Sequence, residues 1–370
     1  MSDYQLHTTA MAAEKAGITI PGNAAFAAGG LALAGRSERL ATIREAYFSG
    51  HVGCFCDSDQ SPEWSRRIAR VARDRLRANA RCEFRASAAI PGYAHGSGKG
   101  KRAVNFQHAM RLDAAMLSGS QDFSNCVSWQ TREMVGCSIA TDIASGLLHE
   151  YIARPGTAGP YASRGYRSDS GMDIWTAAEF CHNQGIGLQI KYGAYDLSTE
   201  AADEKYGVQW GGGIPREFLD AIKNDRVEQV SEVDYDEEVV QDLLFGGHFI
   251  GTGSTTTAGG PGDPVSPGGY VGPHAQALIG YDNTEEFVDW YKQKTGKSLK
   301  ESVYIFDQSW GDWLKMSNWP EHLWGPRPEG AFVLPWSFAK KLIGSGSVAI
   351  NRVKGFAPKR LPDLGFSSWL

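Results

Sequence analysis

Apolar residues recur at helical spacing through much of the first two thirds of the chain. The longest such segment is residues 125–151, where apolar or small side chains fall three or four positions apart. Pro155 and Pro160 are predicted to end this helix, because proline cannot continue the backbone hydrogen bonding. Further helices are predicted at residues 61–81, 173–183, 217–223 and 237–244, with Gly185 as the C-cap of the second of these.

The pattern changes after about residue 245. Short apolar runs bounded by Gly and Pro predict strands at residues 249–250, 275–279, 303–306 and 331–334. Residues 251–272 are rich in Gly, Thr and Pro and are predicted to form a loop. Helices followed by strands indicate an α+β protein with two lobes, not a doubly wound parallel sheet.

Composition and charge exclude several classes of protein. Of the 370 residues, 42% are hydrophobic and 21% are charged, which excludes wholesale disorder. The net charge of −5 indicates neither a nucleic-acid nor a membrane partner. The arginines of residues 61–81 are more typical of a solvated helix face than of a docking surface for an acidic partner. No His/Asp/Glu group has the spacing of metal ligands, so no metal or other cofactor is expected.

Six cysteines are too few for a disulfide scaffold, which directs attention to their chemistry. The longest apolar run, residues 24–34, is about half of a membrane span. It follows a start that contains Asp3 and Glu14, unlike the basic start of a signal peptide. We therefore expect no signal peptide, a reducing compartment and a cytoplasmic location.

Cys126 is the best candidate for a reactive cysteine. It begins the predicted helix of residues 125–151, and a helix N-terminus stabilises a thiolate. Cys54 and Cys56 form a C-x-C pair, which is too short for a redox or zinc motif. Cys137 and Cys181 lie inside predicted helices and are expected to be buried packing residues.

The partner of a catalytic cysteine is usually a histidine held by a third group. His274 begins a predicted strand, and His248, which begins another, is its strongest competitor. Downstream, a strand leads into Gln308, whose amide could orient an imidazole while Trp310 shields the hydrogen bond from water. An aromatic turn packed only for stability is the alternative interpretation of that segment.

Four short motifs then follow one another in a characteristic order. They are Gln121 before Cys126, Ser170-Gly171 followed by residues 172–178, Pro273-His274-Ala275, and Gln308-Ser309-Trp310-Gly311. In this order they resemble the papain-like cysteine peptidase family, in which a glutamine and a cysteine at a helix start precede a Gly-Gly turn, a histidine and Asn-Ser-Trp-Gly. The 148 residues from Cys126 to His274 match the family interval of roughly 130–150. The resemblance covers about residues 118–350 and is strongest to divergent members encoded by bacteria and their viruses.

The chain departs from the family pattern in several places. Gln308 stands where the family has Asn, which lengthens the amide side chain by one methylene. The aromatic residue after the cysteine is displaced to Trp129, and the Cys-Gly-Ser-Cys disulfide context is absent. The 34 residues from His274 to Gln308 imply an inserted helix at residues 285–295. Residues 1–117 have no counterpart and are interpreted as an N-terminal extension, either a pro-segment or a docking module.

The resemblance implies a two-lobed fold and a set of roles. Residues 118–240 would form a helical lobe and residues 241–370 an antiparallel, barrel-like lobe. Cys126 would attack as a thiolate paired with protonated His274, and Gln308 would hold that imidazole under Trp310. Gln121 and the backbone N–H of Cys126 would form the oxyanion hole.

The resemblance also implies a substrate cleft. Ser170, Gly171 and Met172 would line it, and an extended protein or peptide substrate would bind there. Asp169 and Asp173 flank this loop and could favour a basic substrate residue, although solvated loop carboxylates are the more common case.

The sequence therefore predicts a cysteine endopeptidase that hydrolyses peptide bonds through a thioester. The main alternative is a catalytically weak or inactive binding protein with the same fold, for example a bacteriophage virion component that joins an assembly through residues 1–117. The expected location is therefore cytoplasmic or virion-associated. A transglutaminase-like acyl transferase is a weaker alternative, because it shares the thiolate chemistry.

Overall fold

The computed structural model describes residues 95–354, except residues 118, 149–150, 168, 170, 234–235, 259–264, 266, 313–317 and 344–346 and the side chains of residues 254–258 and 267–273. The predicted helix at residues 61–81 therefore lies outside the described residues, as do Cys54 and Cys56. In the part of the chain that is described, no helix is both long enough and apolar enough to cross a membrane.

One antiparallel sheet forms the second half of the molecule. Its strand order is β4-β9-β5-β6-β7-β8, and β1 also pairs with β6. The strands are β1 (Arg102–Ala103), β4 (Arg226–Glu232), β5 (Phe249–Ala258), β6 (Pro267–Asp282), β7 (Val303–Asp307), β8 (Phe332–Pro335) and β9 (Val348–Lys354). A separate two-stranded hairpin joins β2 (Lys191–Tyr192) to β3 (Tyr195–Asp196).

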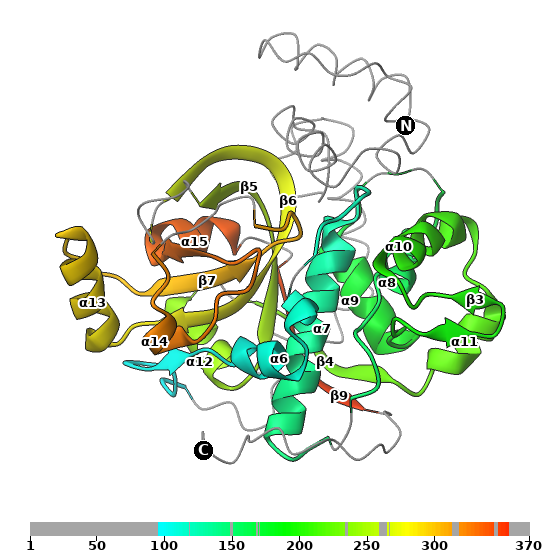
Figure 1. Cartoon of the computed structure of the whole chain (residues 1–370), viewed down its shortest axis with the longest axis horizontal. Coiled ribbons are helices and arrows are strands. Elements are labelled where there is room, and N and C mark those ends of the chain that lie inside the picture. The colour runs from blue at the N-terminus through cyan, green and yellow to red at the C-terminus, as the bar shows by residue number, and fades with distance from the viewer. Residues whose placement is uncertain are drawn as a thin grey trace, which may run out of the picture.

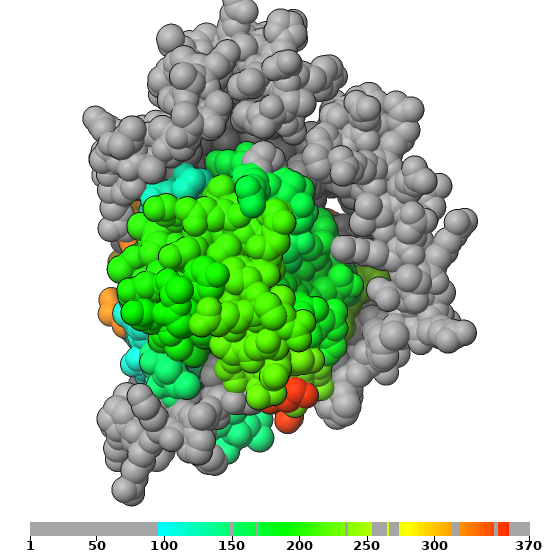
Figure 2. Space-filling view, turned by 90° about the vertical axis from the view of Figure 1, so that its right-hand side faces the viewer, coloured from blue at the N-terminus to red at the C-terminus, as the bar shows by residue number. Residues whose placement is uncertain are grey.

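The helices divide into two groups with α7 (Cys126–Ala144) between them (Figure 1). On one side lie α8 (Ala158–Ala162), α9 (Ile174–Asn183), α10 (Glu200–Gln209) and α11 (Arg216–Ile222), and Figure 2 shows the continuous face that this part of the chain forms. Strands β5, β6, β7 and β8 lie on the other side, with α12 (Glu237–Phe245), α13 (Glu285–Thr295), α14 (Glu321–Trp324) and α15 (Trp336–Leu342). Strand β4 packs against α9, and β9 packs against α7. Next to α7 lie α6 (Phe106–Leu112) and the short 3₁₀ turn at Ala114–Leu117.

This architecture confirms the α+β class, and the helices predicted at residues 173–183, 217–223, 237–244 and 285–295 are all present. The loop predicted at residues 251–272 is wrong: much of it belongs to β5 and β6, which form a long hairpin with Ile250 opposite Leu278 and Gly253 opposite Ala275. Backbone pairing between the two strands outweighs the low strand preference of their Gly and Pro residues.

The end of α7 also differs from the prediction. The helix ends at Ala144, well before Pro155, and Pro160 lies inside α8. The cause is Gly146, which adopts a left-handed φ of 71° and donates its N–H to the carbonyl of Ile143. Such a glycine terminates a helix without the steric penalty of a side chain.

Residues just before position 118 pack into the same body as the rest of the chain. Arg102 and Ala103 pair with Asp282 and Tyr281 of β6, and Phe106 of α6 is fully buried in the core. These residues, assigned to the N-terminal extension from the sequence, are therefore part of the packed structure. Residues 1–94 lie outside the described residues, so the extension's role stays a prediction.

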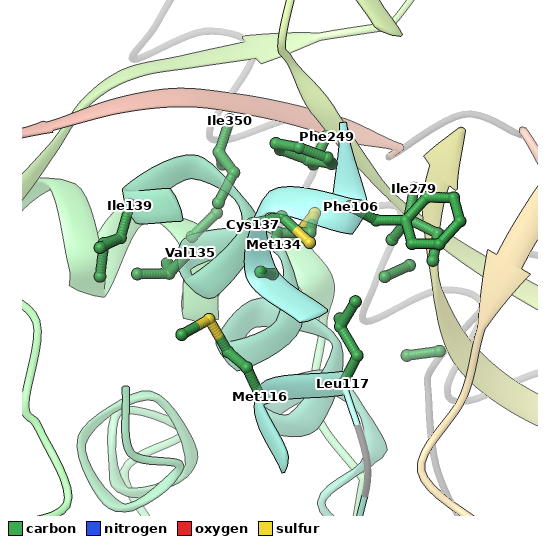
Figure 3. Close-up of a cluster of buried hydrophobic side chains, with 14 of the residues drawn as sticks. Phe106, Met116, Leu117, Met134, Val135, Cys137, Ile139, Phe249, Ile279 and Ile350 are labelled. Atoms are coloured by element: carbon green, nitrogen blue, oxygen red, sulfur yellow. The ribbon is translucent and has the colours of Figure 1, made fainter. Parts of the chain in front are cut away.

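The core is built around α7, of whose 19 residues 17 are buried. Figure 3 shows Met134, Val135 and Ile139 of this helix among apolar side chains from the rest of the chain. Those partners include Phe106, Met116, Leu117, Phe249, Ile279 and Ile350. Cys137 belongs to this core, and Cys181 of α9 is buried as well, so both confirm the prediction of packing cysteines.

Because α7 is buried on all sides, its polar side chains must find partners inside the protein. Gln130 donates two hydrogen bonds from Nε2, at 2.7 Å to the carbonyl of Thr252 in β5 and at 2.6 Å to the carbonyl of Gln276 in β6. This one amide joins the helix to both strands of the long hairpin.

We expect Gln130→Met to lower the free energy of unfolding by about 1–3 kcal/mol, because two buried hydrogen bonds are lost while the volume is largely kept. Urea denaturation followed by tryptophan fluorescence measures this. Gln184→Met, at an exposed position after α9, is the matched control and should change stability little. Equal effects of the two substitutions would contradict the assignment.

Candidate active site

Cys126 is the first residue of α7 and is fully buried. Its Sγ accepts a hydrogen bond from the backbone N–H of Ala275 at 3.4 Å, and Ala275 directly follows His274 on β6. The fold thus brings the predicted cysteine and the predicted histidine region together. The competing His248 lies elsewhere, directly before Phe249, the first residue of β5. Its Nε2 is 3.3 Å from the Asn351 amide nitrogen.

The His274 ring lies against the ring of Trp310. The two are stacked with 4.2 Å between their centroids and 19° between their planes. The Gln308 side chain favours the protonated form of His274, and its Nε2 donates to the carbonyl of Gly311 at 3.2 Å. The three predicted residues therefore meet at one place, although Gln308 replaces the expected Asn.

Burial has a direct effect on the charge of His274. Its pKa lies well below the usual 6.5, because removal from water penalises the imidazolium, and the amide of Gln308 opposes this shift. In this arrangement the ring is neutral at pH 7. The protonated imidazole that the resemblance implies is disfavoured while the site excludes water.

Gln121 contacts the segment that contains Gln308 and Trp310. Ser309 donates from Oγ to Gln121 Oε1 at 2.6 Å, and the backbone N–H of Gln121 donates to the carbonyl of Ser309 at 2.9 Å. The Gln121 amide also donates to the carbonyl of Phe123 at 2.9 Å. The segment that contains Gln308 and Trp310 is thereby joined to the segment that leads into Cys126.

The predicted substrate loop also contacts the start of α7. Met172 is buried, and the Ser128 hydroxyl donates to its sulfur at 3.6 Å. The carbonyl of Gly171 accepts from the Tyr166 hydroxyl at 2.7 Å. Ser170 lies outside the described residues.

The two aspartates that flank this loop have structural partners. Asp169 accepts from the backbone N–H of Ser124 and the hydroxyl of Tyr161, each at 2.7 Å. Asp173 caps α9 by accepting from the N–H of Thr176 at 3.0 Å. Both carboxylates are partly buried and accept hydrogen bonds from the protein, so they help to hold the loop in place. Their preference for a basic substrate residue stays a prediction.

Glu204 of α10 is a residue of this region that the sequence analysis missed. It is 2% exposed, and its Oε1 accepts from the Asn125 amide at 2.8 Å and from the Trp129 indole at 2.7 Å. The backbone N–H of Asp122 also points at this carboxyl. Glu204 sits in a strongly polar stretch whose pattern is that of a solvated helix, so the sequence contains no signal for its burial.

Within the described residues, no group of three or more His, Cys, Asp or Glu side chains is arranged to hold a metal ion. No family model matches the chain, and no curated protein matches it significantly.

Several solved structures are similar to this one, and they are cysteine proteases. Xylellain, a cysteine protease from Xylella fastidiosa, is 13% identical with a TM-score of 0.43 over 65% of this chain and 83% of its own. Digestive procathepsin L 3 of Tenebrio molitor larval midgut is 12% identical with a TM-score of 0.43, over 86% of this chain and 100% of its own. The cysteine protease and lectin-like domains of Cwp84, a surface layer associated protein of Clostridium difficile, are 15% identical with a TM-score of 0.42, over 67% and 51%.

These proteins belong to the class that the four sequence motifs resemble. Because the TM-scores lie below 0.5, the roles of individual residues depend on the geometry of this chain alone.

Glu204 predicts a pH dependence of stability. Burial raises its pKa from 4.5 to about 8, so between these values the folded chain keeps a proton that the unfolded chain has released. This contribution to stability is fully present below pH 4.5 and is lost as the pH rises to about 8. We expect the stability of the wild type relative to Glu204→Gln to fall by up to about 1.4 kcal/mol per pH unit across that range. Urea denaturation at several pH values measures it, and a constant difference would contradict it.

Proposed function

We propose that the protein is a cysteine-dependent hydrolase of peptide bonds, with Cys126 as nucleophile and His274 as its general base and acid. The observation that carries this proposal is the contact between the Cys126 sulfur and the backbone N–H of Ala275, which places the thiol beside the histidine at a helix start. The stacking of Trp310 on His274 and the effect of Gln308 on the pKa of His274 support it.

The geometry suggests the following chemistry. His274, neutral when buried, takes the proton of the Cys126 thiol as the sulfur attacks the carbonyl carbon of the scissile bond. The oxygen of the tetrahedral intermediate accepts hydrogen bonds from the backbone N–H of Cys126 and from Gln121, whose amide nitrogen has a second hydrogen besides the one given to Phe123. The intermediate collapses to a thioester, and His274 gives the proton to the departing amine. Water then hydrolyses the thioester with the same base.

A substrate reaches this site only after a conformational change. The side chains of Cys126, His274 and Gln121 are all 0% exposed. Opening the site would admit water, which would also raise the pKa of His274 back towards its ordinary value. The closed arrangement is that of a latent enzyme, and it equally suits a binding protein that never turns over substrate, such as a component of a virion.

Labelling of thiols separates these functions. Burial raises the pKa of Cys181 to about 12 and that of Cys137 well above 9, so neither forms a thiolate near neutral pH. We expect iodoacetamide to label Cys126 ahead of these two and to abolish peptide hydrolysis in parallel. Peptide mapping by mass spectrometry measures the labelling, with Cys126→Ala as the control. Preferential labelling of Cys54 with hydrolysis intact would contradict the proposal.

The role of Gln308 generates a second test. Replacing it by Leu removes the amide that would hold the protonated ring of His274 during catalysis, and a loss of about 1.4 kcal/mol corresponds to a tenfold change in rate. We expect Gln308→Leu to lower kcat by about tenfold or more. Gln308→Asn, which keeps the amide of the family at a shorter reach, should retain more activity than Leu. Peptide hydrolysis by purified variants measures both, and equal activity of Leu and wild type would exclude Gln308 from the site.

A further inference from the structure

The residue that precedes α7 makes no side-chain capping hydrogen bond. Asn125 precedes the helix, yet its amide is directed to Glu204 at 2.8 Å and not to the first turn. Residues 121–129, here called the nucleophile segment, contain Gln121 and Cys126, and three donors from this segment converge on the one carboxyl group of Glu204.

We propose that Glu204 is a positioning residue that holds the nucleophile segment in its reactive conformation. The proposal deepens the function proposed above and rests on it. Its donors come from Asp122, next to Gln121, from Asn125, next to Cys126, and from Trp129, one turn into the helix. A single acceptor thus sets the positions of both oxyanion donors relative to the sulfur.

The burial of these partners makes the arrangement rigid. Asn125, Trp129 and Glu204 are at most 2% exposed, so water cannot replace a lost hydrogen bond. The Trp129 indole packs closely against Gly119, because a Cβ atom on Gly119 would lie 2.1 Å from its ring. Gly119 accepts through its carbonyl from the N–H of Gly311, which connects the indole to the segment that follows Gln308.

The chemical state of Glu204 suits this role. Burial raises its pKa to about 8, with the charge of Asp122 adding to the shift, so the carboxyl is mostly neutral at pH 7. It can therefore accept hydrogen bonds beside Cys126 without setting a negative charge against a developing thiolate. An ordinary ionised carboxylate at this position would oppose the nucleophile.

The neighbouring residue on α10 provides a matched control. Asp203 is also fully buried, and it also accepts from several donors, the N–H and hydroxyl of Thr157 and the N–H of Ala158. These contacts hold α10 against the start of α8 and do not involve the nucleophile segment. Asp203→Leu, which also removes a buried acceptor, therefore perturbs the same helix at a different place.

The test compares Glu204→Met with Asp203→Leu in the full chain. The Met side chain has no oxygen, so it removes the acceptor of the three donors of the nucleophile segment. We expect it to lower kcat about tenfold while KM changes less than about twofold, and to slow the alkylation of Cys126 by iodoacetamide by a similar factor. Asp203→Leu should leave both rates within about twofold, even where it lowers the melting temperature.

A purely structural role for Glu204 predicts a different outcome. Glu204→Met would then lower the melting temperature and leave kcat and the alkylation rate of the folded protein unchanged, or Asp203→Leu would lower both rates as much. Trp129→Phe, which deletes one donor, gives a milder variant if Glu204→Met does not fold, and it should lower kcat by a smaller factor. If the wild type hydrolyses no peptide, the proposed function fails, and the alkylation rates of Cys126 still decide the role of Glu204.

Discussion

The complete burial of α7 is the constraint on which the rest of the structure depends. A helix that is surrounded by protein must direct its polar groups to partners inside the protein. The amide nitrogen of Gln130 binds two strands, and the amide nitrogen of Asn125 and the indole of Trp129 bind Glu204. The hydrogen bonds that stabilise the core are thus also those that locate Cys126 between the helical half and the sheet.

The same exclusion of water sets the chemistry of the site. It keeps His274 neutral and Cys137 and Cys181 protonated, and it leaves Glu204 mostly uncharged at pH 7. Gln308, Ser309 and Trp310 are consecutive residues that all belong to the site. Gln308 and Trp310 act on His274, and Ser309 contacts Gln121. A short stretch of chain after β7 therefore links the base to the segment that leads into the nucleophile.

Local patterns were sufficient for many of the secondary-structure predictions. The helix at 285–295 was inferred from the length of chain between two motifs, and it is present with those bounds. The helix at 173–183 was predicted from its apolar spacing, and it begins one residue later because Asp173 acts as its cap. The prediction failed at residues 251–272, where long-range pairing of β5 with β6 overrides a composition typical of loops. Strands β4 and β9 and helix α10 were not predicted either, because their patterns are mixed or strongly polar.

The sequence by itself determined which residues carry the candidate chemistry, since a cysteine at a helix start and a histidine, a glutamine and a tryptophan in one order are properties of the chain. It also determined the α+β class through the change of periodicity near residue 245. Only the tertiary structure decided that Cys126 lies next to His274 and that His248 does not, because that distinction depends on which end of the hairpin α7 meets. Only the tertiary structure buried Glu204, because the burial of a charged side chain depends on neighbours that are distant in the sequence.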